Sequence, residues 1–281
     1  MKGRGDAMET IGFFGGDQRM ARLARLLAAD GYIIKTWGLA DMPDAGKPSE
    51  AAEADRVVLP VPLEKDGKLY GTNLPLGELW PRLRPDVPVY AGAVPEKARA
   101  HAETLGLAVT DYLADEALAV RNAVPTAEGA VALAMEHLDV TLRGAPCLVV
   151  GFGRIGKLLA RDLAGLGARV SVSARKSADL AWIESLGYAP LHTEKLAGAL
   201  GGFHVVFNTV PRMVLDAALL RELPESCVLI ELASAAGIDA EAAKALGLDY
   251  VKAGGLPGKV APETAARAIR ETLYRLWEER Q

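Results

Sequence analysis

The sequence predicts an α/β protein with two domains, each built on a parallel β-sheet. Short apolar runs of strand length alternate with helical segments along nearly the whole chain, a pattern typical of βαβ units. One such run, residues 147–150, is followed by the glycines Gly151, Gly153 and Gly156 and then by a helical segment. The order G-x-G-x-x-G between a strand and a helix is typical of dinucleotide-binding Rossmann domains.

Length and composition agree with two globular domains. The chain has 281 residues, of which 50% are hydrophobic and 24% charged, and its net charge is −4. This charge gives no reason to expect nucleic acid or an anionic membrane as a partner. Cys147 and Cys227 lie in apolar runs, as expected for reduced, buried thiols. Residues 1–10 are polar and lack the apolar region of a signal peptide, and no apolar run is long enough to span a bilayer, so we expect a cytoplasmic protein.

Residues 1–120 are predicted to form the first domain, Rossmann-like or flavodoxin-like. Gly15 and Gly16 follow its first strand, but the third glycine of a nucleotide-binding turn is missing, so we interpret them as a plain turn. Asp17 is expected to cap the next helix. The connection 41–54 is polar, and 64–72 is expected to be an exposed loop or hairpin. Strands are expected at 10–14, 32–37, 56–60, 87–91 and 107–110, and helices at 18–29 and 96–105.

Residues 121–262 are predicted to form the second, Rossmann domain, with a bridging helix between the domains and a cleft that separates them. Pro125 suits the first position of that helix, which should run to residue 138. The final helix, 262–279, has an apolar stripe, and we expect residues 263–281 to join the first domain. Further strands are expected at 147–152, 168–174, 188–191, 203–208, 227–232 and 250–252, and helices at 157–166, 178–186, 193–200, 215–223 and 240–246.

Each glycine of the motif has an expected role. Gly151 permits a tight turn, Gly153 lets a pyrophosphate approach the backbone, and Gly156 lets the helix pack closely on the strand. The N–H groups at the start of the following helix would face the phosphates, and Arg154 and Ile155 of the glycine turn are assigned to the cofactor with them. The alternative is a glycine-rich turn that binds nothing, but the βαβ pattern around the motif favours a dinucleotide.

The end of the second strand in this domain favours NADP(H) over NAD(H). NAD-binding domains usually carry Asp or Glu there for the ribose 2′-hydroxyl. This chain has Arg175, Lys176 and Ser177 instead. A guanidinium group matches a phosphate in bidentate geometry, so we expect Arg175 and Ser177 to hold the 2′-phosphate. Two alternatives stay open: the cations are solvated on an exposed turn, or the site accepts NAD(H) as well.

Other candidates follow the remaining strands and the bridging helix. Asn208 either binds the nicotinamide side or closes a turn, Arg212 is either a counter-ion for a substrate carboxylate or a surface arginine, and Thr126 either opens an anion site or only starts a helix. No metal ligand and no catalytic residue is assigned, because the four histidines lie where structural or solvated roles are expected. The assigned set is, for the cofactor, Gly151, Gly153, Arg154, Ile155, Gly156, Arg175, Lys176, Ser177, Asn208, Thr209, Pro211, Leu232 and Ala233, and, for the substrate, Thr126, Arg212, Ser234, Gly255 and Pro257.

Six segments in a fixed order carry a resemblance to a known family. Together they resemble the A subunits of dipicolinate synthase from spore-forming bacteria, most strongly from Asn122 to Pro262. That family usually has Asp where this chain has Glu231, which is a conservative departure. The layout is more distantly similar to alanine dehydrogenases and 2-hydroxyacid dehydrogenases. The segments are Asn122-Ala-Val-Pro-Thr-Ala-Glu-Gly129, Gly151-Phe-Gly-Arg-Ile-Gly156, Ser173-Ala-Arg175, Asn208-Thr-Val-Pro211, Glu231-Leu-Ala-Ser234 and Gly255-Leu-Pro-Gly-Lys-Val-Ala-Pro262.

The resemblance implies an oxidoreductase of the diaminopimelate branch that acts during sporulation. Its substrate would be the cyclic dicarboxylate 4-hydroxy-tetrahydrodipicolinate, or the dehydrated dihydrodipicolinate, oxidised to dipicolinate while NADP+ or NAD+ accepts a hydride. A smaller, flavoprotein-like B subunit would be its partner, and we expect a homo-oligomer. Two alternatives remain. One is another NAD(P)-dependent amino or hydroxy acid dehydrogenase. A 2-hydroxyacid dehydrogenase of this layout would need an Arg near the end of the fifth strand and a His after it, whereas that strand is followed by Ala-Ser-Ala-Ala236 and no His follows His204, which argues against this alternative. The other is a non-catalytic, dinucleotide-binding redox sensor.

Overall fold

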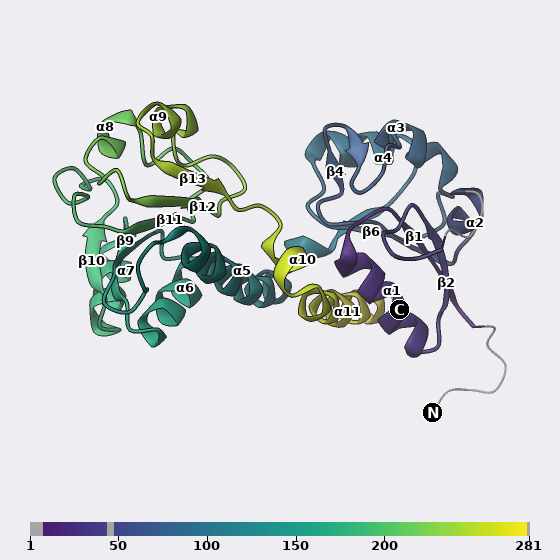
Figure 1. Ribbon diagram of the computed structural model, residues 1–281. Coiled ribbons are helices and arrows are strands. Elements are labelled where there is room, and N and C mark those ends of the chain that lie inside the picture. The colour runs from purple at the N-terminus through teal and green to yellow at the C-terminus, as the bar shows by residue number, and fades with distance from the viewer. Residues whose placement is uncertain (1–7, 44–47, 280–281) are drawn as a thin grey trace. The chain divides into compact units, whose positions relative to one another are not determined.

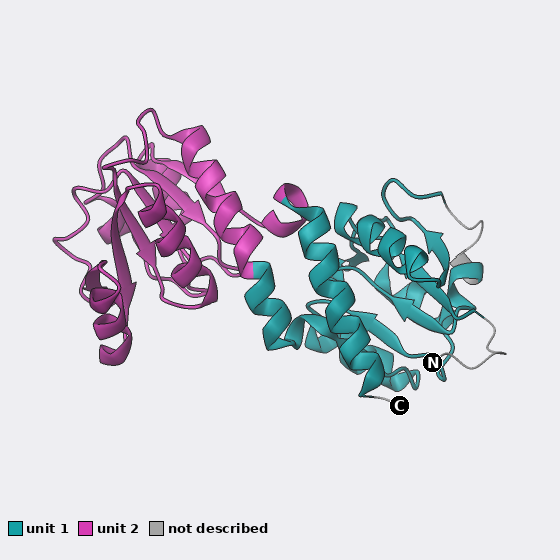
Figure 2. Cartoon of the chain, turned by 90° about the horizontal axis from the view of Figure 1, so that it is seen from below, with its two compact units in different colours: residues 1–122, 261–281 teal, residues 123–260 magenta. Residues whose placement is uncertain are grey.

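The computed structural model describes residues 8–43 and 48–279 (Figure 1). The chain divides into two compact units: residues 1–122 with 261–281 form unit 1, and residues 123–260 form unit 2 (Figure 2). The expectations for residues 1–7, and for 44–47 of the polar connection, lie outside the described residues. Both units carry helices on a parallel sheet, which confirms the predicted α/β fold class. No helix in the described part of the chain combines the length and apolarity needed to cross a bilayer.

Unit 1 has a five-stranded parallel sheet in the order β2-β1-β3-β6-β7. Counted along the chain this is 2-1-3-4-5, the order of flavodoxin-like folds. A small antiparallel hairpin, β4–β5, lies outside that sheet. The strands are β1 (Thr10–Phe14), β2 (Ile33–Trp37), β3 (Arg56–Val58), β4 (Glu64–Lys65), β5 (Lys68–Leu69), β6 (Val89–Ala91) and β7 (Val109–Asp111), and the helices are α1 (Gln18–Ala29), α2 (Pro48–Ala52), α3 (Leu76–Leu79), α4 (Glu96–Thr104) and α11 (Pro262–Glu278).

Helices α1 and α11 lie side by side against one face of this sheet (Figure 1). Asp17 caps α1 as predicted, since its side chain accepts a hydrogen bond from the Arg19 N–H at 3.0 Å. The apolar stripe of α11 is buried at Ile269, Leu273 and Trp277. The last 21 residues of the chain are therefore counted with unit 1, although residues 123–260 intervene in the sequence.

The segment 64–72 forms a hairpin, as predicted, but it is less exposed than expected. Leu69 is fully buried, and the Tyr70 carbonyl accepts a hydrogen bond from the Gly16 N–H at 2.7 Å. A Cβ atom on Gly71 would lie 2.6 Å from the Gly16 nitrogen. The backbone of residues 70–71 thus packs directly against the turn after β1. This packing fits the interpretation of Gly15 and Gly16 as a plain turn.

Unit 2 has a six-stranded parallel sheet in the order β10-β9-β8-β11-β12-β13. Counted along the chain this is 3-2-1-4-5-6, the Rossmann order. The strands are β8 (Pro146–Val150), β9 (Arg169–Ala174), β10 (Ala189–His192), β11 (Val205–Asn208), β12 (Val228–Glu231) and β13 (Asp249–Lys252), and the helices are α6 (Arg154–Gly165), α7 (Ser177–Ser185), α8 (Ala217–Leu220), α9 (Ala240–Ala245) and α10 (Leu256–Val260).

Successive side chains of β8 lie on opposite faces of this sheet and pack into two different apolar clusters. Cys147 and Val149 belong to the apolar cluster under α6 and α7, while Leu148 and Val150 belong to the cluster under α8 and α9. Cys227 is buried on the second face, and both cysteines are free thiols. Burial raises the pKa of each cysteine to about 12, so both stay protonated at neutral pH.

The prediction that the bridging helix starts at Pro125 is wrong. Helix α5 (Glu116–His137) begins nine residues earlier and carries Pro125 in its interior. The segment starts after Asp115, whose side chain accepts a hydrogen bond from the Leu118 N–H at 2.8 Å. Proline removes one intrahelical hydrogen bond, but the Ala- and Leu-rich residues on both sides continue the helix. Helix α5 carries the chain from unit 1 into unit 2 (Figure 2).

Of two other predicted helices, the one at 193–200 is absent and the one at 215–223 is shorter than predicted. Residues 193–200 form isolated turns, because Gly198 has a φ of +80° that a helix does not allow. The expected helix at 215–223 shortens to α8, which begins after Asp216, where the side chain accepts hydrogen bonds from two N–H groups. Helices α2, α3 and α10 were not predicted, and α2 lies within the segment that was expected to be only a polar connection.

Candidate functional site

The glycine turn after β8 shows a different constraint at each glycine. Gly151 has a φ of +103°, which side-chain-bearing residues rarely adopt. A Cβ atom on Gly156 would lie 2.1 Å from the Gly151 carbonyl oxygen, so the close packing of α6 requires a glycine there. Gly153 has an ordinary φ of −84°, and a Cβ atom there would meet nothing within 4 Å. The protein itself therefore does not require glycine at 153, whereas an approaching ligand would.

Gly153 is also the N-cap residue of α6, and no side chain in the described part of the chain caps this helix start. The first N–H groups of α6, at Arg154 and Ile155, follow directly. Such a helix start carries a partial positive charge that favours an anion. The open space at Gly153 and the uncapped helix together fit a dinucleotide pyrophosphate.

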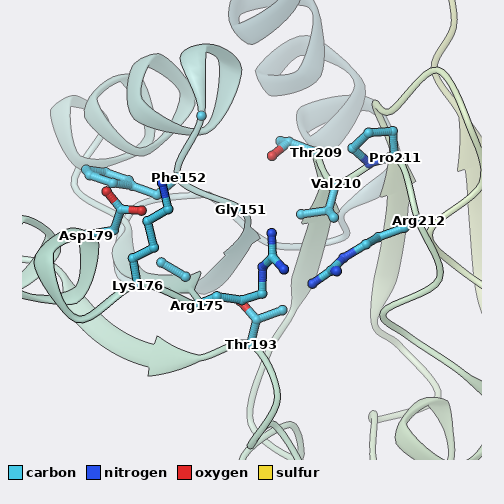
Figure 3. Close-up of a pocket in the computed structure, with 12 residues that line it drawn as sticks. Gly151, Phe152, Arg175, Lys176, Asp179, Thr193, Thr209, Val210, Pro211 and Arg212 are labelled. Carbon is cyan, nitrogen blue, oxygen red and sulfur yellow. The ribbon is translucent and has the colours of Figure 1, made fainter.

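A pocket of about 290 Å³ lies at the carboxyl edge of the sheet in unit 2 (Figure 3). The loops after four adjacent strands form it, and they include those after β8 and β11, the neighbouring strands between which the strand order reverses. Ligands of open α/β sheets bind at this switch point. The lining residues are Gly151, Phe152, Gly153, Ala174, Arg175, Lys176, Asp179, Thr193, Thr209, Val210, Pro211 and Arg212.

Arg175 and Lys176 follow β9 and line this pocket, with both side chains exposed. Ser177, the first residue of α7, is exposed and does not line the pocket. Thr193 is buried, and its hydroxyl donates a hydrogen bond to the buried Ser173 hydroxyl at 3.1 Å. The pocket thus brings together the cations that follow one strand and the polar side chain that follows the next.

The loop after β11 adds Thr209, Pro211 and Arg212 to the same pocket, but Asn208 points into the protein. Asn208 is fully buried, and its Nδ2 donates hydrogen bonds to the Val210 carbonyl at 2.9 Å and to Glu231 Oε1 at 2.8 Å. Both Nδ2 hydrogens are therefore used within the chain. The assignment of Asn208 as a ligand of the cofactor is corrected: it holds the turn before Pro211.

Glu231, the partner of Asn208, is a buried carboxylate that the sequence interpretation missed as a site residue. Besides the Asn208 bond, Oε1 accepts a hydrogen bond from the Ala233 N–H at 3.0 Å. Its Oε2 accepts bonds from the N–H groups of Gly237 at 2.7 Å and Ile238 at 3.0 Å. The sequence feature that could have indicated this role is a charged residue, Glu231, at the end of the otherwise apolar run 228–231. This carboxylate ties the loop after β12 to the loop after β11.

Several predicted residues lie outside the pocket. Leu232 is buried, Ala233 is tied to Glu231, and Ser234 is exposed on the loop between them and Gly237. Gly255 precedes α10 with a φ of +69°, and Pro257 lies within α10. None of these five lines the pocket.

Thr126 was assigned to an anion site at a helix start. The start of α5 lies ten residues before Thr126, so this residue is in the helix interior, where N–H groups bond within the helix. The argument for an anion site at Thr126 is therefore wrong.

Two family models match the chain, one for each part. Residues 10–113 match the model for the N-terminal domain of the A subunit of dipicolinate synthase. Residues 108–252 match the model described as "D-isomer specific 2-hydroxyacid dehydrogenase, NAD binding domain". The second match includes the glycine turn and all the residues that line the pocket. Unit 2 is therefore an NAD-binding domain of the dehydrogenase type, which supports a nicotinamide dinucleotide as cofactor.

Two similar proteins share more than the fold with this chain. The dipicolinate synthase A subunit of Bacillus subtilis (strain 168) is 39% identical over 165 residues, which are 58% of this chain and 56% of that protein. The crystal structure of the dipicolinate synthase A subunit from Bacillus halodurans is 30% identical and superimposes with a TM-score of 0.85, covering 96% of this chain and 99% of that one.

A more distant likeness concerns the fold alone. An L-alanine dehydrogenase structure is 14% identical, with a TM-score of 0.69, and the match covers 97% of this chain and 90% of that one. The expected similarity to dehydrogenases of this layout is confirmed at the level of the fold.

Proposed function

Because the chain belongs to the family of dipicolinate synthase A subunits, we propose that it is the dinucleotide-binding component of a dipicolinate synthase. In this proposal it oxidises a cyclic dicarboxylate of the diaminopimelate branch during sporulation, together with a B subunit. The observation that carries the proposal is the pocket at the switch point of the NAD-binding domain, in a chain whose other domain matches the N-terminal domain of the same family.

NADP(H) is the proposed cofactor, with NAD(H) as the alternative. Gly153 and the start of α6 would hold the pyrophosphate, and Arg175 would hold the 2′-phosphate. The residues after β9 support this choice, because Arg175 and Lys176 line the pocket where NAD-specific domains carry an acid. The cofactor supplies the hydride acceptor.

The proposed substrate is 4-hydroxy-tetrahydrodipicolinate or its dehydrated form. Loss of water from the first gives dihydrodipicolinate, and loss of one hydride to the nicotinamide and one proton to water then gives dipicolinate. The second step completes an aromatic ring, which is a strong driving force for proton loss. A strong protein base is therefore not required.

Dipicolinate formation tests this proposal directly. We expect the purified chain with NADP+, the cyclic precursor and the B subunit to produce dipicolinate and NADPH in equal amounts, followed by ultraviolet absorbance. The same mixture without the B subunit measures how far this chain works alone. Reduction of simple 2-oxo acids by the isolated chain would favour the dehydrogenase alternative. Dinucleotide binding without turnover of any dicarboxylate would favour the redox sensor.

Replacing Arg175 by alanine should weaken NADPH binding and leave NADH binding almost unchanged. A charge-assisted contact to the 2′-phosphate contributes roughly 1.5–3 kcal/mol, or about 10- to 100-fold in affinity. Lys176→Ala should have a smaller effect, because an exposed ammonium group is a screened point charge. The measurement is the dissociation constant of each dinucleotide. An equal loss for both would assign Arg175 to adenine stacking or folding, and no loss for either would make it a solvated cation.

A further inference from the structure

We propose that Arg212 is a second ligand of the cofactor's 2′-phosphate, so that two guanidinium groups from different strand ends hold this phosphate between them. The inference rests on the proposed NADP(H) function and goes beyond it by adding a specificity-determining residue. Arg212 follows β11 and Arg175 follows β9, two strands that lie on opposite sides of β8. Both residues nevertheless line the same pocket, and Figure 3 shows their guanidinium groups pointing toward one another.

The residues that line the pocket carry a net positive charge, which favours binding of an anion. Its lining includes the cations Arg175, Lys176 and Arg212 but only one carboxylate, Asp179. Neither guanidinium group makes a hydrogen bond or an ion pair with any residue among 8–43 and 48–279. Two positive charges that face each other without a counter-ion repel each other. An anion bound between them would be attracted to both, which would outweigh this repulsion. A phosphate monoester carries close to two negative charges at neutral pH and has three terminal oxygens, enough for two guanidinium groups.

The backbone that carries Arg212 is held in place. The Arg212 N–H donates to the Val210 carbonyl at 2.9 Å, and Asn208 bonds to both the N–H and the carbonyl of Val210. On the other side, a Cβ atom on Gly237 would lie 2.8 Å from the Arg212 carbonyl oxygen, so the loop after β12 packs tightly against this turn. Arg212 has an exposed side chain on an anchored backbone, which reduces the entropy cost of positioning it for a ligand.

The position of the pocket favours the adenosine phosphate over a substrate carboxylate. In Rossmann domains the residue after the second strand contacts the adenosine ribose. Here that position belongs to Arg175, and Thr193, after the third strand, lines the same pocket. Arg212 therefore reaches into the adenosine side of the site. We therefore propose the 2′-phosphate, in place of a substrate carboxylate, as the anion that Arg212 binds.

Dissociation constants of four forms of the full chain test the inference: wild type, Arg175→Ala, Arg212→Ala and the double variant. The probes are NADPH, NADH, adenosine 2′,5′-bisphosphate and 5′-AMP. We expect Arg212→Ala to bind NADPH and the bisphosphate about 10- to 100-fold more weakly and to bind NADH and AMP as the wild type does. The two arginines share one ligand, so the loss in the double variant should differ from the product of the single losses.

Two further variants sharpen the result. Arg212→Lys keeps the charge but not the fork of donors, and it should recover only part of the NADPH affinity. Arg161→Ala is the matched control, because Arg161 is an exposed arginine of α6 that pairs with Asp162 and does not line the pocket. It should bind all four probes normally.

An equal loss for NADPH and NADH in Arg212→Ala would overturn the inference and assign Arg212 to the pyrophosphate or the adenine. Normal binding of every probe, with a raised KM for the cyclic dicarboxylate, would overturn it in favour of the substrate carboxylate. Neither result would affect the proposed reaction, which depends on dipicolinate formation by the wild type. If the wild type binds neither dinucleotide, the proposed function itself fails.

Discussion

Replacing Gly153 by valine is expected to abolish dinucleotide binding while unit 2 keeps its fold. The backbone of Gly153 is in the extended region that any residue adopts, and its missing Cβ atom faces open space. A valine side chain would fill the volume that the pyrophosphate needs, in front of the N–H groups of α6. Valine is a poorer N-cap than glycine, so we expect a stability loss of no more than about 1 kcal/mol. Thermal unfolding and the dissociation constants of NADPH and NADH measure the two effects separately.

Gly156→Ala is the contrasting variant. Its new Cβ atom would lie 2.1 Å from the Gly151 carbonyl oxygen, so α6 would have to move away from the turn. We expect this variant to lose both stability and binding, whereas Gly153→Val loses binding alone. A folded Gly153→Val protein that binds both dinucleotides with wild-type affinity would remove the glycine turn from the proposed site.

Local patterns predicted the elements that position the site. The run 147–150, the glycines after it and the helix that follows needed no information from elsewhere in the chain. Strand β8 lies where expected, and α6 begins at Arg154, earlier than the predicted start at residue 157. The start of α5 could not be chosen in the same way. Pro125 suits a first turn, while Asp115 caps an earlier one, and nothing local decides between the two starts.

Tertiary packing explains another difference. Leu196 and Leu200 have the spacing of a helix face, and both are buried. They reach the core from isolated turns, because Gly198 takes a conformation outside a helix. Spacing alone does not distinguish these two ways of burying the same pair of leucines.

The parts of the site that sequence patterns missed depend on strand pairing. Asn208 and Glu231 are 23 residues apart, and only the register of β11 against β12 makes them direct neighbours. The same is true of Arg175 and Arg212, which reach one pocket from the ends of β9 and β11. Residue types at strand ends predict candidates, whereas the pairing decides which of them point to the ligand and which hold the loops.

Replacing Glu231 by glutamine is expected to destabilise the protein strongly. The carboxylate oxygens accept hydrogen bonds from four donors: Asn208 Nδ2 and the N–H groups of Ala233, Gly237 and Ile238. An amide has only one oxygen, so its NH2 group must face two of these buried donors in either orientation. Each donor left unpaired costs about 1–3 kcal/mol, which gives a total of roughly 2–6 kcal/mol. The free energy of unfolding in urea measures this loss.

Glu231→Asp separates the loss of the acceptor from a general sensitivity of this position. It keeps a carboxylate that only accepts hydrogen bonds, and it shortens the side chain by one methylene, so we expect a loss of about 1 kcal/mol. The loop with Val210 and Arg212 is anchored through Asn208. NADPH affinity should therefore fall in Glu231→Gln and recover in Glu231→Asp. If glutamine were as stable as glutamate and bound NADPH equally well, the four hydrogen bonds would not be what holds the two loops in place.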